Sequence, residues 1–248
     1  MARLNAITFD LWQTLILDSP ELGRPRAQAR LGGVQEALRG DGLDFPFDKL
    51  MEASRSCYRI CDDVRTAEGD VTFEEQIDIF LREVEPGLAT RISPATLALL
   101  SQRYADSYFA HPPKIDEGAH RVLETLSRMG VKVGLICNTG STPGATQRIF
   151  LDQVGLARYF DTLVFSDEER LSKPAKRLFH LTLERLGVQP EETVHIGDHP
   201  LNDVVGAKRA GMRAIWLRRP GKEEPSVPPD ALIDDLADTV AAFQRLTS

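Results

Sequence analysis

The sequence is short of cysteine, of net positive charge and of long apolar runs. Its three cysteines are Cys57, Cys61 and Cys137. Their spacing fits no metal or redox motif, so we expect Cys57 and Cys61 to be packed in apolar surroundings and the protein to be cytoplasmic. The net charge of -7 argues against a sequence-independent nucleic-acid binder, because such a protein needs a basic face. No apolar run approaches the ~20 residues of a membrane span, and the N-terminal apolar residues are expected to form a strand rather than a signal peptide.

From Asp116 onward the sequence alternates regularly between helical and strand patterns. Val122, Leu126 and Met129 recur at helical spacing, and Gly130 follows where a helix commonly ends. Strands that alternate with helices at this spacing predict a doubly wound, mostly parallel α/β sheet. Buried strands are expected at residues 6–9, 131–137, 163–165, 194–196 and 214–217.

Residues 18–112 have a different pattern. Apolar residues recur there at helical spacing, and no strand pattern is evident. Ser19-Pro20 precedes the segment's helical pattern and His111-Pro112-Pro113 ends it, and both are typical of hinges. The sequence therefore predicts an all-helical insertion that leaves the α/β core after its first strand and rejoins it later.

Polar residues follow the predicted strands. Asp10 comes directly after the first strand, Asn138 follows the second, and Asp198 follows the strand at 194–196. Lys173 lies between these elements in the chain, and Asp203 comes shortly after Asp198. Because open parallel sheets bind ligands outside the carboxyl ends of their strands, these side chains are expected to form one site.

This arrangement resembles the haloacid dehalogenase-like (HAD) hydrolase superfamily. The resemblance covers residues 1–17 and 113–248 and implies a Rossmann-like α/β core there. Many HAD enzymes carry a helical cap directly after their first motif, and residues 18–112 match that cap in position, length and helical character. The insertion is therefore expected to cover the site.

The resemblance also implies roles for individual residues. Asp10 would be a nucleophile that forms a covalent aspartyl intermediate, Thr14 would support its loop, and Lys173 would bridge the nucleophile and the transferred group. The metal would be Mg²⁺, which prefers oxygen ligands. Its protein ligands would be the carboxylates of Asp10 and Asp198 and the backbone carbonyl of Trp12.

The predicted phosphate-binding residues are Cys137, Asn138, Thr139 and Lys173. Relatives usually have Ser or Thr where Cys137 stands, and a thiol is a weaker hydrogen-bond donor than a hydroxyl. Backbone amides of the turn, or Thr139, are expected to compensate. Asp203 is expected behind the metal ligands or as an acceptor that orients Lys173.

Trp12 is the departure from the pattern that matters most. HAD phosphatases usually have a second Asp at this position, which protonates the leaving group and deprotonates water, and an indole cannot do either. Such acid–base assistance typically contributes ~10²–10⁴-fold. His199 is a candidate replacement, against the alternative that it is a solvated loop histidine.

Three functions stay open on this basis. The first is a Mg²⁺-dependent phosphatase that acts on a small phosphate ester through an aspartyl-phosphate. The second is a metal-independent 2-haloacid dehalogenase, which Trp12 favours and which Asp198 and Pro200 oppose, because dehalogenases have Ser and Asn at those two places. The third is a phosphate-binding or regulatory protein of low activity.

The expected partner is a small phosphorylated molecule, with neither nucleic acid nor membrane involved. The overall charge of -7 would not attract such an anion, so local groups must bind it. The sequence indicates no oligomeric state. Weak candidates for an anion contact from the insertion, as alternatives to solvated surface arginines, are Arg24, Arg26 and Arg30.

Overall fold

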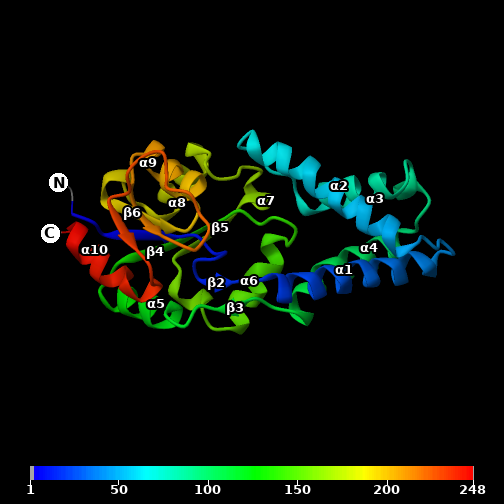
Figure 1. Ribbon diagram of the computed structural model, residues 1–248, viewed down its shortest axis with the longest axis horizontal. Helices are drawn as coiled ribbons and strands as arrows, with labels where there is room; N and C mark the ends of the chain where they lie inside the picture. Colours follow the sequence, from blue (N-terminus) through cyan, green and yellow to red (C-terminus); the bar gives the residue numbers. More distant parts are fainter. Residues whose placement is uncertain (1–2, 248) are drawn as a thin grey trace.

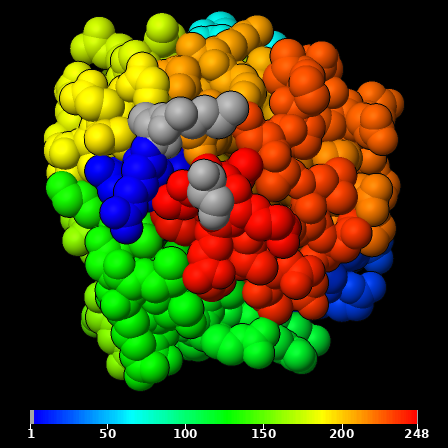
Figure 2. Space-filling model, turned by 90° about the vertical axis from the view of Figure 1, so that its left-hand side faces the viewer, coloured from blue at the N-terminus to red at the C-terminus, as the bar shows by residue number. Residues whose placement is uncertain are grey.

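The computed structural model describes residues 3–247 and shows an elongated molecule (Figure 1). A sheet with helices on both sides occupies one end, and four helices from residues 20–110 occupy the other. Figure 2 looks onto the sheet end, where the N-terminal segment lies beside the C-terminal helix. No helix among residues 3–247 combines the length and apolar character needed to cross a membrane.

The central sheet has six strands in the order β5-β4-β1-β6-β7-β8, and every neighbouring pair is parallel. β1 lies in the interior of the sheet between β4 and β6, with Phe9 paired to both Leu135 and Ile196. The doubly wound, mostly parallel α/β fold class is therefore confirmed. The strands of this sheet are β1 (Ala6–Phe9), β4 (Lys132–Cys137), β5 (Thr162–Phe165), β6 (Thr193–Gly197), β7 (Arg213–Leu217) and β8 (Ala231–Ile233).

Side chains alternate between the two faces of the sheet and form a separate apolar cluster on each. In β7, Ile215 and Leu217 belong to the cluster under α5, α6 and α10, whereas Ala214 and Trp216 belong to the cluster under α8 and α9. This period of two is the pattern expected of a strand that is buried on both faces. The α-helices and shorter helical turns of this part are α5 (Ala119–Arg128), α6 (Gly144–Gln153), η2 (Ala157–Tyr159), α7 (Ser166–Glu169), α8 (Lys176–Leu186), η3 (Pro190–Glu192), η4 (Pro200–Val205), α9 (Gly206–Arg209), η5 (Leu236–Asp238) and α10 (Thr239–Thr247).

A short antiparallel pair joins the sheet to the helical insertion. β2 (Ile16–Leu17) pairs with β3 (Lys114–Ile115), so the chain leaves and returns at the same place. The helices between them lie within the range 18–112 that the sequence predicts for the cap, and they enclose an apolar cluster of their own, which includes Cys57 and Cys61. They are α1 (Pro20–Gly40), α2 (Phe47–Thr66), α3 (Phe73–Val84), η1 (Leu88–Thr90) and α4 (Pro94–Ala110).

Candidate active site

The end of β1 places Asp10 at the carboxyl edge of the sheet. The backbone N–H of Asp10 donates to the Ile196 carbonyl at 2.8 Å, which continues the pairing with β6 by one residue. The chain then turns sharply, and Thr14 Oγ1 donates to Asp10 Oδ2 at 3.0 Å. Thr14 is fully buried and Asp10 is 6% exposed. The hydroxyl of Thr14 therefore fixes the carboxylate that the sequence predicts to be the nucleophile.

Lys173 joins Asp10 to Asp203. Its Nζ donates to Asp10 Oδ1 at 2.6 Å and to Asp203 Oδ1 at 2.7 Å, and the lysine is 2% exposed. Asn138, which follows β4, holds the lysine backbone from both sides. Its Oδ1 accepts from the Lys173 N–H at 2.8 Å, and its Nδ2 donates to the Lys173 carbonyl at 3.0 Å. The side chain of Asn138 thus positions Lys173.

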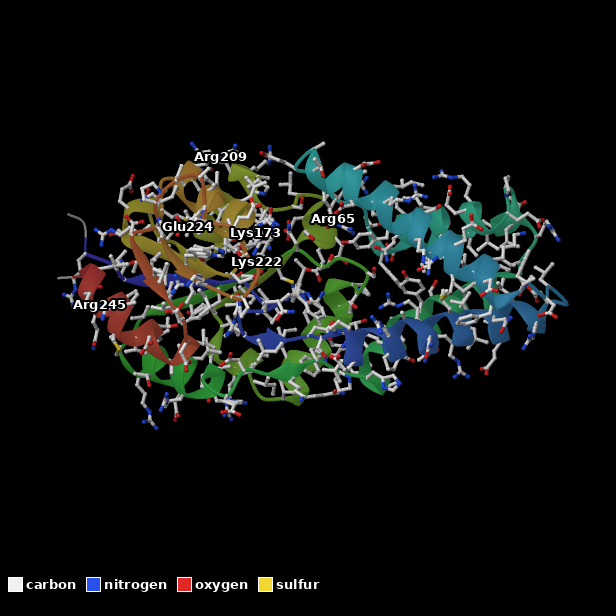
Figure 3. All side chains as sticks on the ribbon, in the orientation of Figure 1. Arg65, Lys173, Arg209, Lys222, Glu224 and Arg245 are labelled. Atoms are coloured by element: carbon white, nitrogen blue, oxygen red, sulfur yellow. The ribbon has the colours of Figure 1, made fainter. Side chains whose placement is uncertain are left out.

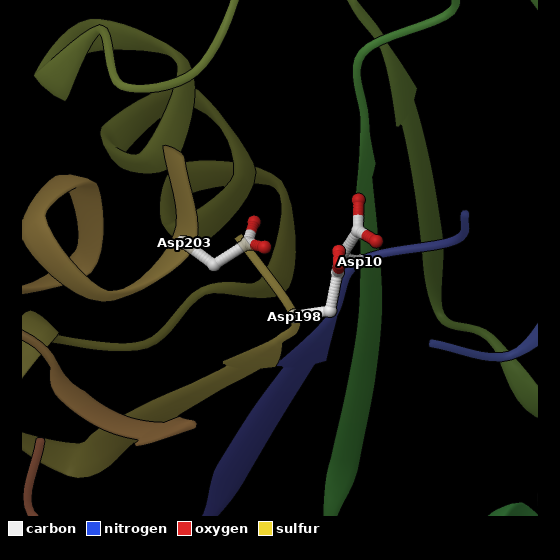
Figure 4. Close-up of side chains that lie close together, drawn as sticks. All are labelled: Asp10, Asp198 and Asp203. Atoms are coloured by element: carbon white, nitrogen blue, oxygen red, sulfur yellow. The ribbon is translucent and has the colours of Figure 1, made fainter. Parts of the chain in front are cut away.

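Asp198 and Asp203 come from the end of β6 and from η4. The carboxylates of Asp10, Asp198 and Asp203 each have an oxygen within 4.8 Å of the other two, and Figure 4 shows the three side chains together above the ends of the strands. Asp203 packs directly on Gly197, where an added Cβ would lie 2.2 Å from Asp203 Cγ. The approach of Asp203 to the sheet edge therefore requires glycine at position 197.

Asp203 also contacts a buried polar pair, His195 and Thr8, which the sequence analysis missed. His195 Nε2 lies 3.2 Å from Asp203 Oδ1, and His195 Nδ1 lies 2.8 Å from Thr8 Oγ1. Burial lowers the pKa of His195, so its ring is neutral near pH 7. In that form Nε2–H donates to Asp203, and Nδ1 accepts from the Thr8 hydroxyl. Alternate residues of adjacent strands face the same side, and this is the signal in the sequence that connects Thr8 with His195.

The pKa values of these groups reflect burial and mutual charge. Burial raises the pKa of Asp10 to about 7, Lys173 opposes this rise, and the charges of Asp203 and Asp198 add to it. Burial alone would lower the pKa of Lys173, but the carboxylates of Asp10 and Asp203 more than offset it and raise that pKa. Burial opposes ionisation of Asp203 too, yet Lys173 and His195 hold its pKa well below the usual range. Lys173 and Asp203 are therefore a charged pair.

Asp198 has an oxygen that the chain leaves without a hydrogen bond. Its Oδ2 is buried and has no hydrogen-bond partner among the described residues, although Lys222 Nζ lies 3.2 Å away outside hydrogen-bonding geometry. Burial raises the pKa of Asp198, the charge of Asp203 adds to the rise, and Lys222 opposes it. A buried carboxylate oxygen that accepts no hydrogen bond, next to two further carboxylates, suits an oxygen-preferring divalent cation. The residues present therefore fit Mg²⁺.

A cavity of about 890 Å³ opens above these groups, between the sheet edge and the insertion. Asp10, Asn138, Lys173, Asp198 and Asp203 all line it, so the structure brings these predicted residues together. Basic side chains reach it from both parts of the molecule, and Figure 3 labels four of them: Arg65, Lys173, Arg209 and Lys222.

Trp12 lines this cavity beside Asp10. Its ring packs edge-on against Tyr108 of α4, with centroids 5.9 Å apart, and the guanidinium of Arg26 lies 5.9 Å from its centroid. The indole therefore fills the junction between the nucleophile loop and the insertion. Metal binding through the Trp12 carbonyl stays a prediction.

Cys137 is the predicted phosphate-binding residue that the structure does not bring to the cavity. Its thiol is fully buried and donates to Gln147 Oε1 at 3.3 Å, and it is absent from the cavity lining. Burial raises the pKa of Cys137 well above its usual range, so it remains a thiol. The side chain points away because residue 137 is the last of β4 and faces the core cluster. Thr139 does line the cavity, and its N–H donates to Ser166 Oγ at 2.9 Å.

His199 lines the cavity but is poorly suited to transfer protons. The Asn202 N–H donates to His199 Nδ1 at 3.2 Å, which fixes Nδ1 as an acceptor. Burial lowers the pKa of His199, so the neutral ring carries its proton on Nε2. In this tautomer the lone pair of Nδ1 already accepts the Asn202 N–H, so it cannot take up a proton from water. The proton on Nε2 belongs to a neutral ring, which is a weak acid. The acid–base position left by Trp12 is therefore not filled by His199 in this arrangement.

Comparison with known proteins identifies the family of this chain. A family model for haloacid dehalogenase-like hydrolases matches residues 4–211. The phosphoserine phosphatase of Thermus thermophilus is 38% identical over 125 residues, which are 50% of this chain and 49% of that protein. The glyceraldehyde 3-phosphate phosphatase of Pyrococcus furiosus is 26% identical over 221 residues, or 88% of this chain and 82% of that protein.

Solved structures share the fold. A 2-haloacid dehalogenase from Pseudomonas syringae superposes with a TM-score of 0.74 at 24% identity, over 98% of this chain and 99% of the other. A HAD phosphatase from Thermococcus onnurineus superposes with a TM-score of 0.64 at 24% identity, over 96% and 97%. At this identity the likeness extends to the fold and leaves the reaction open.

Proposed function

The chain belongs to the haloacid dehalogenase-like hydrolase family, and from that premise we propose that it is a Mg²⁺-dependent phosphatase of small phosphate monoesters. The phosphatases among its relatives support this reaction type. The proposal assigns the attack to Asp10 and the binding of the phosphoryl group to Asn138, Thr139 and Lys173.

The observation that carries the proposal is the buried, hydrogen-bond-free Oδ2 of Asp198 beside Asp10. Three carboxylates crowded within 4.8 Å repel one another, which contributes to the raised pKa values of Asp10 and Asp198. Lys173 compensates Asp10 and Asp203, whereas Asp198 has only the half-exposed Lys222 nearby. The carboxylates of Asp10 and Asp198 would hold a divalent cation, which would supply the missing charge that phosphoryl transfer requires.

The chain's own residues then have distinct tasks. Asp10, oriented by Thr14 and Lys173, attacks phosphorus, and the bond from phosphorus to the ester oxygen breaks. The ester oxygen takes a proton from water and leaves as the alcohol. The Lys173 ammonium lies where it can donate to a phosphoryl oxygen while Asp203 fixes its direction. A bound Mg²⁺ would neutralise charge on the phosphoryl oxygens and on the carboxylates that hold it. Water then hydrolyses the aspartyl-phosphate to phosphate and regenerates Asp10.

One observation favours a dehalogenase instead. Trp12 is apolar and packed against Tyr108 and Arg26, so no carboxylate occupies the acid–base position that phosphatases of the family use. A haloacid dehalogenase attacks carbon and expels halide, which needs no proton. The buried Oδ2 of Asp198, which contacts Lys222 but accepts no hydrogen bond among the described residues, opposes this alternative, because metal-free chemistry gives it no function.

Three assays on the purified chain separate the candidates. Phosphate release from p-nitrophenyl phosphate should require Mg²⁺ and stop in a chelator, whereas halide release from 2-chloropropionate should be absent. Calorimetry should show Mg²⁺ binding that weakens by roughly tenfold or more in Asp198→Asn. The control is Asp234→Asn, since Asp234 is exposed and is not among the residues that line the cavity. Halide release that is unaffected by a chelator would overturn the proposal, and binding of phosphate without turnover would favour the low-activity alternative.

A further inference from the structure

Arg30 of α1 is the basic side chain of the cavity that lacks a carboxylate partner among residues 3–247. It lines the same cavity as Asp10 and Lys173, about 890 Å³ in volume. Each of the other arginines and lysines that line it has a carboxylate within 3.2 Å. These pairs are Arg26–Asp18, Arg65–Asp70, Lys173–Asp10, Arg209–Glu68 and Lys222–Asp198.

The surroundings hold Arg30 firmly but leave its charge uncompensated. Arg30 is 8% exposed. Its Nε donates to Ser107 Oγ at 3.3 Å and its Nη2 donates to Thr142 Oγ1 at 3.4 Å. Its Cζ lies 4.5 Å from the ring centroid of Tyr104. All of these partners are neutral, and a buried cation without a counter-charge is unfavourable unless an anion joins it.

The guanidinium has donors left for such an anion. Nη1 makes no hydrogen bond to a described residue, and Nη2 retains a second N–H after its bond to Thr142. Two adjacent N–H donors of a planar guanidinium match the two oxygens of a carboxylate. Arg26 is different: its two Nη atoms donate to Asp18 and its Nε donates to the His111 carbonyl. Arg30 is therefore the available anion-binding group in the cavity that Asp10 and Lys173 also line.

We propose that the substrate is a small phosphate monoester that also carries a carboxylate, and that Arg30 binds this carboxylate. The proposal rests on the phosphatase function, because the phosphoryl group must lie at Asp10 and Lys173 for the second anion to reach Arg30 in the shared cavity. A cavity of about 890 Å³ is of the size that binds small molecules. Arg30 then sets specificity and takes no part in the chemical step.

The test compares two esters of the same length, 2-phosphoglycolate and 2-hydroxyethyl phosphate, which differ by a carboxylate against a hydroxymethyl group. The native protein should have the higher kcat/KM for 2-phosphoglycolate. In Arg30→Met this preference should fall by roughly ten- to a hundredfold, mainly through KM, since a hydrogen-bonded charged group is lost. Arg30→Lys keeps the positive charge but loses the paired N–H donors of the guanidinium, so it should retain part of the preference.

The matched control is Arg24→Met on the same helix. Arg24 is exposed and does not line the cavity, so its removal should leave the preference unchanged. Circular dichroism checks the fold of each variant, and Arg30→Lys serves as the test if Arg30→Met does not fold. Hydrolysis of both esters by the native protein with equal kcat/KM, or an equal loss on both esters in the Arg30 variants, would overturn the proposal.

Binding separates this inference from the phosphatase proposal. In an Asp10→Asn background, calorimetry should show that Arg30→Lys weakens binding of 2-phosphoglycolate more than binding of 2-hydroxyethyl phosphate. If the native protein hydrolyses neither ester yet this difference is found, the phosphatase function fails and the carboxylate site stands. If both esters are hydrolysed and no difference is found, the carboxylate site fails and the phosphatase function stands.

Discussion

Lys173 Nζ lies 2.6 Å from Asp10 Oδ1, and both side chains are buried. The same ammonium contacts Asp203, so one positive charge is shared by two carboxylates. Lys173 therefore serves both stability and activity. Its charge lowers the repulsion between the carboxylates of Asp10 and Asp203, and its hydrogen bond holds the Asp10 nucleophile in place.

Lys173→Met should damage both stability and activity. It leaves two buried carboxylates without their cation, which should lower the free energy of unfolding by about 3 kcal/mol or more. Phosphate release should fall by roughly 10²–10³-fold. Urea unfolding and initial rates measure the two effects. Lys176→Met is the control, since Lys176 is exposed at the start of α8 and should be neutral in both.

Gly197→Ala should displace Asp203. The added Cβ would lie 2.2 Å from Asp203 Cγ, so the carboxylate must move away from Lys173 and His195. We expect a loss of about 2 kcal/mol or more in unfolding free energy and a large loss of activity. Gly32→Ala in α1 is the control: an added Cβ meets nothing within 4 Å there, and alanine favours the helix. A Gly197→Ala variant as active as Gly32→Ala would contradict this account of Asp203.

Much of this site follows from the sequence because strand ends have a simple geometry. Asp10, Asn138 and Asp198 directly follow buried strands, and parallel pairing brings their positions to one edge. The position of Cys137 outside the cavity did not follow from the sequence, because an end-of-strand residue faces one side of the sheet or the other according to a register that the pattern alone did not fix.

The pairing of cations with carboxylates could not be predicted either. Arg26 pairs with Asp18, eight residues before it in the chain. Arg65 and Asp70, in contrast, also make hydrogen bonds to the α/β core: Arg65 donates to the Gly140 carbonyl, and Asp70 accepts from the Ser166 hydroxyl. Such contacts depend on how the helices pack on the sheet. The short strands β2 and β3 and the last strand β8 were also missed, because two or three residues show no period.

Asp167 should make stability depend on pH. Burial raises the pKa of Asp167 from 3.8 to about 6, and the hydrogen bond that Asp167 accepts from the Gly144 N–H offsets only part of this rise. An acid whose pKa is raised by folding is protonated more in the folded than in the unfolded state between these values. The free energy of unfolding should therefore fall as pH rises from 3.8 to about 6, by up to about 3 kcal/mol from this group.

Asp167→Asn should remove this contribution. The variant should gain stability relative to the native chain when the pH is raised from about 4 to about 7, as measured by urea unfolding at both pH values. Asp152→Asn on the exposed face of α6 is the control and should show no such change. Equal stability differences at the two pH values would show that Asp167 titrates normally.

Trp12→Asp should restore acid–base assistance if its absence limits turnover. Esters with poor leaving groups need protonation most, so their hydrolysis should rise by up to about 10²-fold, and esters with good leaving groups should change less. Trp12→Asn is the matched control, because it removes the same contacts with Tyr108 and Arg26 without adding a proton carrier. If folded Trp12→Asp is no faster than Trp12→Asn on any ester, the missing carboxylate does not limit the reaction.

The central claim is that Asp10 becomes phosphorylated, and trapping the intermediate tests it most directly. The chain should be mixed with a fast-leaving phosphate ester and Mg²⁺, quenched in acid after one turnover, digested and analysed by mass spectrometry. We predict a phosphoryl group on the peptide that contains Asp10, lost on mild alkaline treatment and absent from Asp10→Asn. Phosphate release without any label on Asp10, or the same label in Asp10→Asn, would contradict the account.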